Sequence, residues 1–225
     1  MPFQLDQIVP WGRSLDEYIK MFSLTRDELR LKILSCADGP ASFNSELTKY
    51  GGIVTSVDPI YQFTALEIEQ RIDEVYEEVL QQTHQNRDCY VWEKISSVEE
   101  LGKIRMAAMK RFLSDFESGK MQKRYLACEL PALPFGDKEF DIALCSHFLF
   151  TYSYHLSFDF HYKSIEEMSR VAQQVRIFPV LTFDGSISKH LQPIIDKLSA
   201  QDINASIEQV EYEFQRGGDK MLKIN

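Results

Sequence analysis

Basic side chains, cysteines and long apolar runs are all scarce in this sequence. Its 225 residues include 25 lysines and arginines against 34 aspartates and glutamates, a formal net charge of −9 at pH 7. Because nucleic-acid binding depends on basic side chains that neutralise phosphates, a nucleic acid is not expected as the main partner. No segment approaches the roughly 18 uninterrupted apolar residues of a membrane-spanning helix, so no membrane association is expected either.

The four cysteines also lack the spacing of metal ligands, and no metal site is predicted. Free thiols are typical of proteins in the reducing cytoplasm, which is the expected location. The first residues combine neither the basic region nor the apolar core of a signal peptide, so none is expected. The remaining candidates are a globular protein that acts on small molecules or on other proteins.

What the sequence does contain is a strand–turn–helix–strand pattern. An apolar run at residues 31–34 predicts a parallel strand covered on both faces. Asp-Gly-Pro at 38–40 predicts a turn, and the next helix is expected to be capped by Ser42 or Asn44. Apolar residues at 53–57 then predict a second strand. This order is that of a parallel βαβ unit.

The second strand ends in an acid, Asp58, which follows Gly39 by 58 − 39 = 19 residues. This matches the interval of about 20 residues between the glycine turn of a nucleotide-binding βαβ unit and the acid that binds ribose hydroxyls. Ala37 and Ala41 occupy the flanking glycine positions, and alanine disfavours positive φ angles. The alternative is an ordinary βαβ crossover without a ligand.

The rest of the chain predicts a doubly wound α/β sheet. Ser14 is expected to cap a first helix, and two amphipathic helices at about 65–84 and 97–116 fill the long interval after Asp58. The remaining elements expected are strands at about 124–128, 140–145 and 175–181, helices at about 164–174 and 189–201, and strands at 205–214 and 220–224. A short glycine turn joins the last two strands and predicts an antiparallel hairpin.

Two stretches point to a family. Residues 32–43, Lys-Ile-Leu-Ser-Cys-Ala-Asp-Gly-Pro-Ala-Ser-Phe, resemble the first motif of class I S-adenosylmethionine-dependent methyltransferases. Residues 127–146 resemble that family's adenine-contacting segment and fourth strand, with Leu-Pro-Phe followed by Phe-Asp. The resemblance covers residues 31–225. It implies a Rossmann-like methyltransferase fold, an α/β sheet of seven mostly parallel strands with a C-terminal antiparallel hairpin. We expect one domain over 1–225, with an N-terminal helical segment at 1–30 and a helical insertion within about 62–120.

The resemblance also implies S-adenosyl-L-methionine as cofactor. Asp58 would accept the ribose hydroxyls, Glu129 the adenine amino group, and the backbone around the first turn would lie against the amino-acid tail. The cofactor-binding residues predicted in this way are Ala37, Asp38, Gly39, Asp58, Pro59, Glu129, Leu130 and Ser146.

His147 follows the fourth strand and is the candidate catalytic base or orienting group; the alternative is a histidine that lines the pocket without a catalytic role. The acceptor of the methyl group, a small molecule or a protein side chain, is expected to contact residues near the N-terminus and in the aromatic stretch 148–162. The substrate-pocket residues predicted there are Trp11, Arg13, Tyr152, Tyr154 and His155.

Three functions remain open. Methyl transfer is the first. A non-catalytic binding or scaffold protein of the same fold is the second, because Ser35 occupies a position where the family usually has an acid. An NAD-dependent oxidoreductase is the third, although the terminal hairpin argues against it. The insertion is expected to roof the cofactor site over a mostly aromatic pocket with few charges; alternatively it extends the side of the sheet or forms a homodimer interface.

Overall fold

The computed structural model describes residues 9–225, so the first eight positions of the expected N-terminal segment lie outside the described residues. In chain order the elements are α1 (Leu15–Phe22), η1 (Glu28–Arg30), β1 (Lys32–Cys36), α2 (Phe43–Lys49), β2 (Ile53–Val57), η2 (Pro59–Gln62), α3 (Ala65–Gln85), η3 (Arg87–Cys89), α4 (Val98–Met121), β3 (Tyr125–Leu126), β4 (Phe140–Ser146), α5 (Phe158–Val171), β5 (Ala172–Phe178), α6 (Leu191–Ser199), β6 (Ala205–Gln209) and β7 (Lys220–Ile224). Within residues 9–225, no helix is long and apolar enough to cross a membrane.

The strands form one seven-stranded sheet in the order β3-β2-β1-β4-β5-β7-β6. The pairs among β1 to β5 are parallel, whereas β7 runs antiparallel to both β5 and β6. This arrangement confirms the predicted fold class. The last pair differs from the expected hairpin in one respect, because β6 ends at Gln209 and residues 210–219 form a longer connection.

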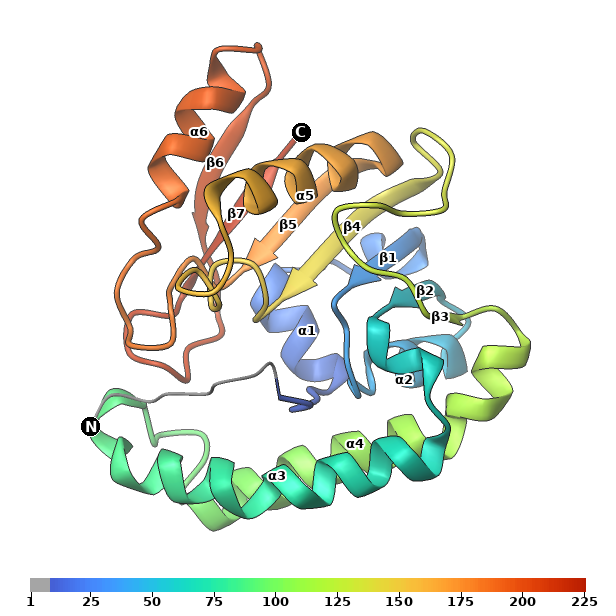
Figure 1. Ribbon diagram of the computed structural model, residues 1–225, viewed down its shortest axis with the longest axis vertical. Coiled ribbons are helices and arrows are strands. Elements are labelled where there is room, and N and C mark those ends of the chain that lie inside the picture. Colours follow the sequence, from blue (N-terminus) through green and yellow to red (C-terminus); the bar gives the residue numbers. More distant parts are fainter. Residues whose placement is uncertain (1–8) are drawn as a thin grey trace.

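Helices cover both faces of the sheet (Figure 1). On one face, α5 and α6 bury residues such as Ile165, Met168 and Ile194 against the inner side chains of β4 and β5. On the other face, Tyr18 and Phe43, from α1 and α2, stack with ring centroids 4.4 Å apart and join the cluster that packs on β1 and β4. Parallel strands covered on both faces are apolar throughout, which explains the continuous apolar runs in the sequence.

The helices α3 and α4 lie side by side and extend past the carboxyl ends of the strands (Figure 1). A capping box between Thr64 and Glu67 begins α3, and Ser97 caps α4. The buried face of α3 is the one that its spacing predicts, from Ile68 to Val79. On α4 the fully buried residue of the second turn is Arg105, where the predicted apolar face has Ile104.

The helix after β4 differs from the expected one. Ser157, rather than Ser164, is its N-cap, and its hydroxyl accepts from the Phe160 N–H at 3.1 Å. Ser164 instead lies on the buried face of α5. The helix therefore includes part of the aromatic stretch and passes directly into β5 at Ala172, three residues before the predicted strand.

Asn44 is not a cap either, because it lies inside α2 and its amide donates to Val54 O and Ser56 Oγ at 3.3 and 3.0 Å. Ser42 is at the N-cap position but makes no capping hydrogen bond to the backbone. Burial of Asn44 against β2 satisfies its amide, and this tertiary contact fixes the seating of α2 on the sheet.

Candidate functional site

A cavity of about 370 Å³ opens at the carboxyl ends of β1, β2 and β4. This is the end of a doubly wound sheet at which ligands bind, and the volume falls within the roughly 300–1,000 Å³ of ligand pockets. The floor is made by the residues that follow these three strands. The far walls come from α3 and α4, through Val79, Thr83, Leu101 and Arg105.

The turn after β1 forms one side of this floor. Ala37 and Gly39 both adopt left-handed backbone conformations, with φ of 51° and 52°. The expectation that alanine would avoid positive φ at this turn is therefore wrong. Left-handed backbone at a non-glycine residue costs about 1–3 kcal/mol and persists where neighbouring contacts enforce it. Here those contacts come from Asp38, between the two residues.

The Asp38 carboxylate is buried and accepts three hydroxyl hydrogen bonds. Tyr18 and Ser35 donate to one oxygen at 2.5 Å each, and Ser56 donates to the other at 2.6 Å. Burial raises the pKa of Asp38, and the three hydrogen bonds oppose that shift. Ser35 occupies the position where the resembled family usually has an acid. Here its hydroxyl donates to Asp38, an acid three residues later in the chain.

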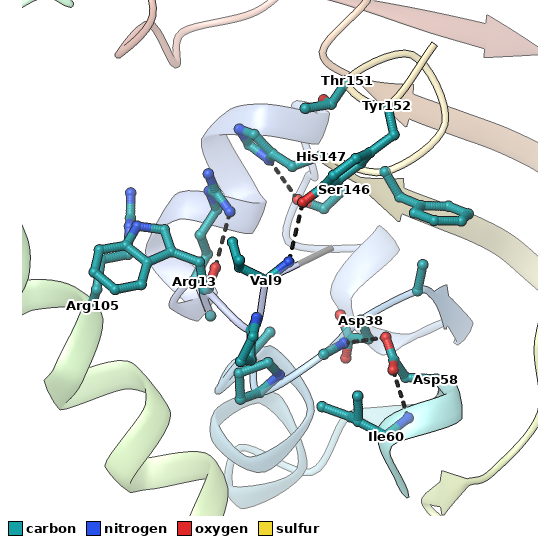
Figure 2. Close-up of a pocket in the computed structure, with 18 of the residues that line it drawn as sticks. Val9, Arg13, Asp38, Asp58, Ile60, Arg105, Ser146, His147, Thr151 and Tyr152 are labelled. Carbon is teal, nitrogen blue, oxygen red and sulfur yellow. Dashed lines mark hydrogen bonds between the residues drawn. The ribbon is translucent and has the colours of Figure 1, made fainter. Parts of the chain in front are cut away.

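Asp58 connects this turn to the end of β2 (Figure 2). Its Oδ2 accepts from the Gly39 N–H and its Oδ1 from the Ile60 N–H, both at 2.9 Å. Burial raises the pKa of Asp58 to about 6 despite these bonds, and the negative charges of Asp38 and Glu129 add to the rise. Each carboxylate oxygen can accept a second hydrogen bond, so a pair of ligand hydroxyls can still bind.

The segment after β3 forms the next part of the wall. Leu130 is buried, and the Glu129 side chain is exposed at the rim. Pro59 begins η2 beside them. The structure brings all eight predicted cofactor-binding residues to the lining of one cavity. Their individual roles stay predictions.

His147 lies at the end of β4 with a left-handed backbone, φ 51°. The backbone N–H of His147 donates to Phe178 O at 2.6 Å, and its ring Nδ1 lies 2.9 Å from Ser146 Oγ. Burial lowers the pKa of His147 well below the ordinary value, and the Arg13 and Arg105 cations lower it further. The imidazole is therefore neutral at pH 7. A neutral imidazole of this kind is better suited to forming hydrogen bonds than to taking up an extra proton.

The N-terminal segment packs directly on the turn after β1. A Cβ at Gly12 would lie 2.0 Å from Pro40 O, so only glycine allows this approach. The contact places Trp11 and Arg13 in the cavity wall, where Trp11 packs on Tyr76 of α3 with ring centroids 5.8 Å apart.

Two predicted pocket residues lie elsewhere. Tyr152 lines the cavity, and its hydroxyl accepts from the Val9 N–H at 3.3 Å. Tyr154 is 65% exposed and donates to Asp184, and neither Tyr154 nor His155 lines the cavity. Consecutive turns after β4 direct these two side chains outward, so we remove both from the pocket.

Comparison with known proteins identifies a relative. No protein-family model matches the chain. The chain is 36% identical over 223 residues to the uncharacterised protein MJ0045 of Methanocaldococcus jannaschii, and the match covers 98% of this chain and 97% of that protein. The chain belongs to the MJ0045 family.

Solved structures are similar at lower identity. A putative S-adenosyl-L-methionine-dependent methyltransferase from Methanococcus maripaludis is 10% identical, with 94% of this chain and 82% of that chain covered and a TM-score of 0.46. A SAM-dependent methyltransferase from Aquifex aeolicus is 15% identical, with 92% and 90% covered and a TM-score of 0.42.

In this member of the MJ0045 family, sequence reasoning missed several lining residues. Arg105 had a local signal, because the spacing from Leu101 through Arg105 to Ala108 places it on the buried face of α4. Tyr90 and Phe214 had none. Their rings stack with centroids 4.9 Å apart although they are 214 − 90 = 124 residues apart in the chain.

The helices α3 and α4 reach the cavity, as expected of a roof. The expectation that few charged residues line the cavity is wrong. Asp38, Asp58 and Glu129 lie on one side, and Arg13 and Arg105 on the other. Figure 2 shows this separation, with Arg13 and Arg105 across the cavity from the two aspartates. The site of this MJ0045-family protein is therefore electrically polar.

Proposed function

We propose that this protein binds S-adenosyl-L-methionine and transfers its methyl group to a small molecule or a protein side chain. One observation carries the proposal: Asp58 contacts the left-handed turn after β1 and shares a cavity with the acidic segment after β3. An acid, a close backbone approach and a second acid at adjoining strand ends suit a nucleoside with a charged tail.

In this proposal Asp58 accepts the ribose hydroxyls, and the turn at residues 37–39 lies against the amino-acid tail. Glu129 accepts from the adenine edge, while buried Leu130 covers the ring. S-adenosylmethionine supplies a methyl group on a sulfonium, ready for in-line displacement by a nucleophile. What the chain then contributes is position and the exclusion of water.

Ser146 and His147 stand where the acceptor would approach. With its pKa lowered by burial, His147 is neutral and can accept a hydrogen bond from the acceptor's nucleophilic group. Its backbone bond to Phe178 and its contact with Ser146 hold the ring in place. We assign His147 an orienting role.

Calorimetric titration with S-adenosylhomocysteine and with NAD tests the proposal. We expect S-adenosylhomocysteine to bind and NAD not to bind. Asp58→Ala should lose at least about 2 kcal/mol of the cofactor's binding free energy, because a charged acceptor of two hydroxyls is removed. Asp73→Asn, an exposed acid on α3, is the matched control and should bind as the wild type does.

Two results would contradict parts of the proposal. Equal affinity of the wild type and Asp58→Ala would remove Asp58 from the ribose site. Binding of NAD in preference to S-adenosylhomocysteine would replace the methyltransferase by an oxidoreductase.

A further inference from the structure

The basic side of the cavity carries an excess positive charge. Arg105 is fully buried, and its Nη1 lies 2.5 Å from Glu17 Oε1. The same oxygen accepts from the Tyr212 hydroxyl at 3.0 Å, and Glu17 Oε2 accepts from the N–H and hydroxyl of Ser14. Both oxygens of Glu17 are therefore engaged. Within residues 9–225, Glu17 forms an ion pair with Arg105 and with no second guanidinium, although its charge also acts on Arg13.

Arg13 carries the second guanidinium on this side of the cavity. Its Nη1 donates to the Trp11 carbonyl at 3.1 Å, and its Nε has no hydrogen-bond partner among residues 9–225. None of the ion pairs within residues 9–225 includes Arg13, although Arg13 lines the cavity. Burial lowers the pKa of Arg13, and repulsion from Arg105 lowers it further. Arg13 is partly buried and its Nε is fully enclosed. An enclosed cation without a counter-ion is costly, so a ligand that supplies one would gain binding free energy.

Two more buried donors on this cavity lack partners. The Nε of Arg105 and the Thr151 hydroxyl line the cavity and make no hydrogen bond within the described chain. Buried polar groups in proteins are normally paired, so each unpaired group calls for a partner, and in a cavity a ligand or a water can supply it. These two groups and the Nε of Arg13 can all donate a hydrogen bond to an oxygen of a ligand.

The walls between these donors are aromatic. Tyr90 stacks on Phe214, and the rings of Tyr152 and Phe183 meet edge to face at 4.7 Å. All four rings line the cavity. A flat apolar body fits between such walls, with its charged end directed to Arg13.

We propose that the methyl acceptor is a small aromatic carboxylic acid whose carboxylate pairs with Arg13. This inference rests on the proposed methyl transfer and names its substrate class. Two guanidiniums against one glutamate leave one net positive charge, which a monovalent carboxylate balances. The planar fork of arginine matches the two carboxylate oxygens.

A carboxylate at Arg13 has two sources, the acceptor or the amino-acid tail of the cofactor. We assign it to the acceptor, because Arg13 lies across the cavity from Asp38 and Asp58, the residues of the proposed cofactor site (Figure 2).

Ligand-observed NMR titration of the full chain with benzoate and with neutral benzamide is the test, in the free protein and in the protein saturated with S-adenosylhomocysteine. We expect benzoate to bind at least about tenfold more tightly than benzamide. Arg13→Gln should abolish that preference and leave the affinity for S-adenosylhomocysteine within about twofold of the wild type. Arg26→Gln, an exposed arginine remote from the cavity lining, is the matched control.

Two outcomes overturn the inference. In the first, benzoate binds the wild type no better than benzamide. In the second, Arg13→Gln weakens S-adenosylhomocysteine about tenfold but leaves 5′-methylthioadenosine, which lacks the amino-acid tail, unchanged; the carboxylate at Arg13 is then the cofactor's. If S-adenosylhomocysteine does not bind at all, the methyltransferase proposal fails, and the benzoate comparison on the free protein decides the anion site separately.

Discussion

At the scale of single residues, the turn after β1 keeps a left-handed backbone without the usual glycine. Ala37 holds a left-handed conformation that glycine would adopt more readily, and Asp38 makes three hydroxyl hydrogen bonds beneath it. The turn therefore differs in residue type from the motif it resembles but keeps an acid and a close backbone approach. Serine at position 35 is a donor to that acid.

The ionisation of Asp58 leads to a prediction for pH. With a pKa of about 6, raised mainly by burial, the carboxylate of the free protein is mostly protonated at about pH 5. In the proposed complex, ribose hydroxyls donate to the ionised form, so binding favours loss of the proton. The affinity for 5′-methylthioadenosine should rise about tenfold from about pH 5 to about pH 7 and then level off. Calorimetry across this range measures it.

Asp58→Asn is the control for this prediction, because the amide does not titrate. Its affinity should be lower and nearly independent of pH. The same pH profile in the wild type and in Asp58→Asn would assign the titration to another group. In the free protein the raised pKa has the opposite effect on stability: the free energy of unfolding falls as pH rises from about 4 toward 6.

At the scale of elements, α4 is both roof and crossover. Its first half lines the cavity, and its second half packs Phe112 and Phe116 against Tyr125 of β3. The Asp115 carboxylate accepts hydrogen bonds from the side chains of Arg124 and Tyr125 at 2.7–2.9 Å, which fixes α4 to β3. The close approach at this junction depends on Gly119.

Gly119→Ala should destabilise the protein. A Cβ there would lie 2.3 and 2.6 Å from two ring carbons of Tyr125, a buried side chain held by its bond to Asp115. We expect a loss of about 1–3 kcal/mol of unfolding free energy from overpacking, although alanine favours helices by about 1 kcal/mol over glycine. Urea denaturation measures it. Ser118→Ala, at an exposed neighbouring position, should cost nothing, and equal stability of both variants would contradict the argument.

At the scale of the whole molecule, one buried network joins distant segments. Glu17 of α1 contacts Arg105 of α4, and both contact Tyr212 in the connection between β6 and β7. Burial alone would raise the pKa of Glu17, but the Arg105 and Arg13 cations lower it to about 2. The network thus holds α4 over the strand ends and depends on an ionised glutamate.

Glu17→Gln should therefore destabilise the protein by about 3–5 kcal/mol at pH 7, because it leaves Arg105 buried without a counter-ion. In the wild type, the stability that Glu17 contributes is present above about pH 4.5 and should be lost as pH falls toward 2. Chemical denaturation at about pH 7 and pH 3 measures both effects. Asp16→Asn, in an exposed ion pair with Lys20, should cost less than about 1 kcal/mol. A Glu17→Gln variant as stable as Asp16→Asn would contradict this account.

Features that depend on neighbours in sequence were predictable. The stripe from Ile68 to Val79, the cap at Ser14 and the interval between Gly39 and Asp58 follow from helical periodicity, capping and the length of one βαβ unit. The resemblance to methyltransferases and the short glycine turn near the C-terminus predicted seven mostly parallel strands with an antiparallel last pair, which the sheet has. These local rules led to the strand ends where the cavity opens.

Features that depend on distant partners were not predictable. Ser157 and Ser164 are equally good caps by type, and only the burial of Ser164 on the inner face of α5 selects the first. Arg105 meets Glu17 across 105 − 17 = 88 residues, and this contact decides that one arginine of the cavity is neutralised while Arg13 is not. Sequence periodicity shows which face of a helix is buried, but the charge balance of a cavity depends on which faces meet in three dimensions.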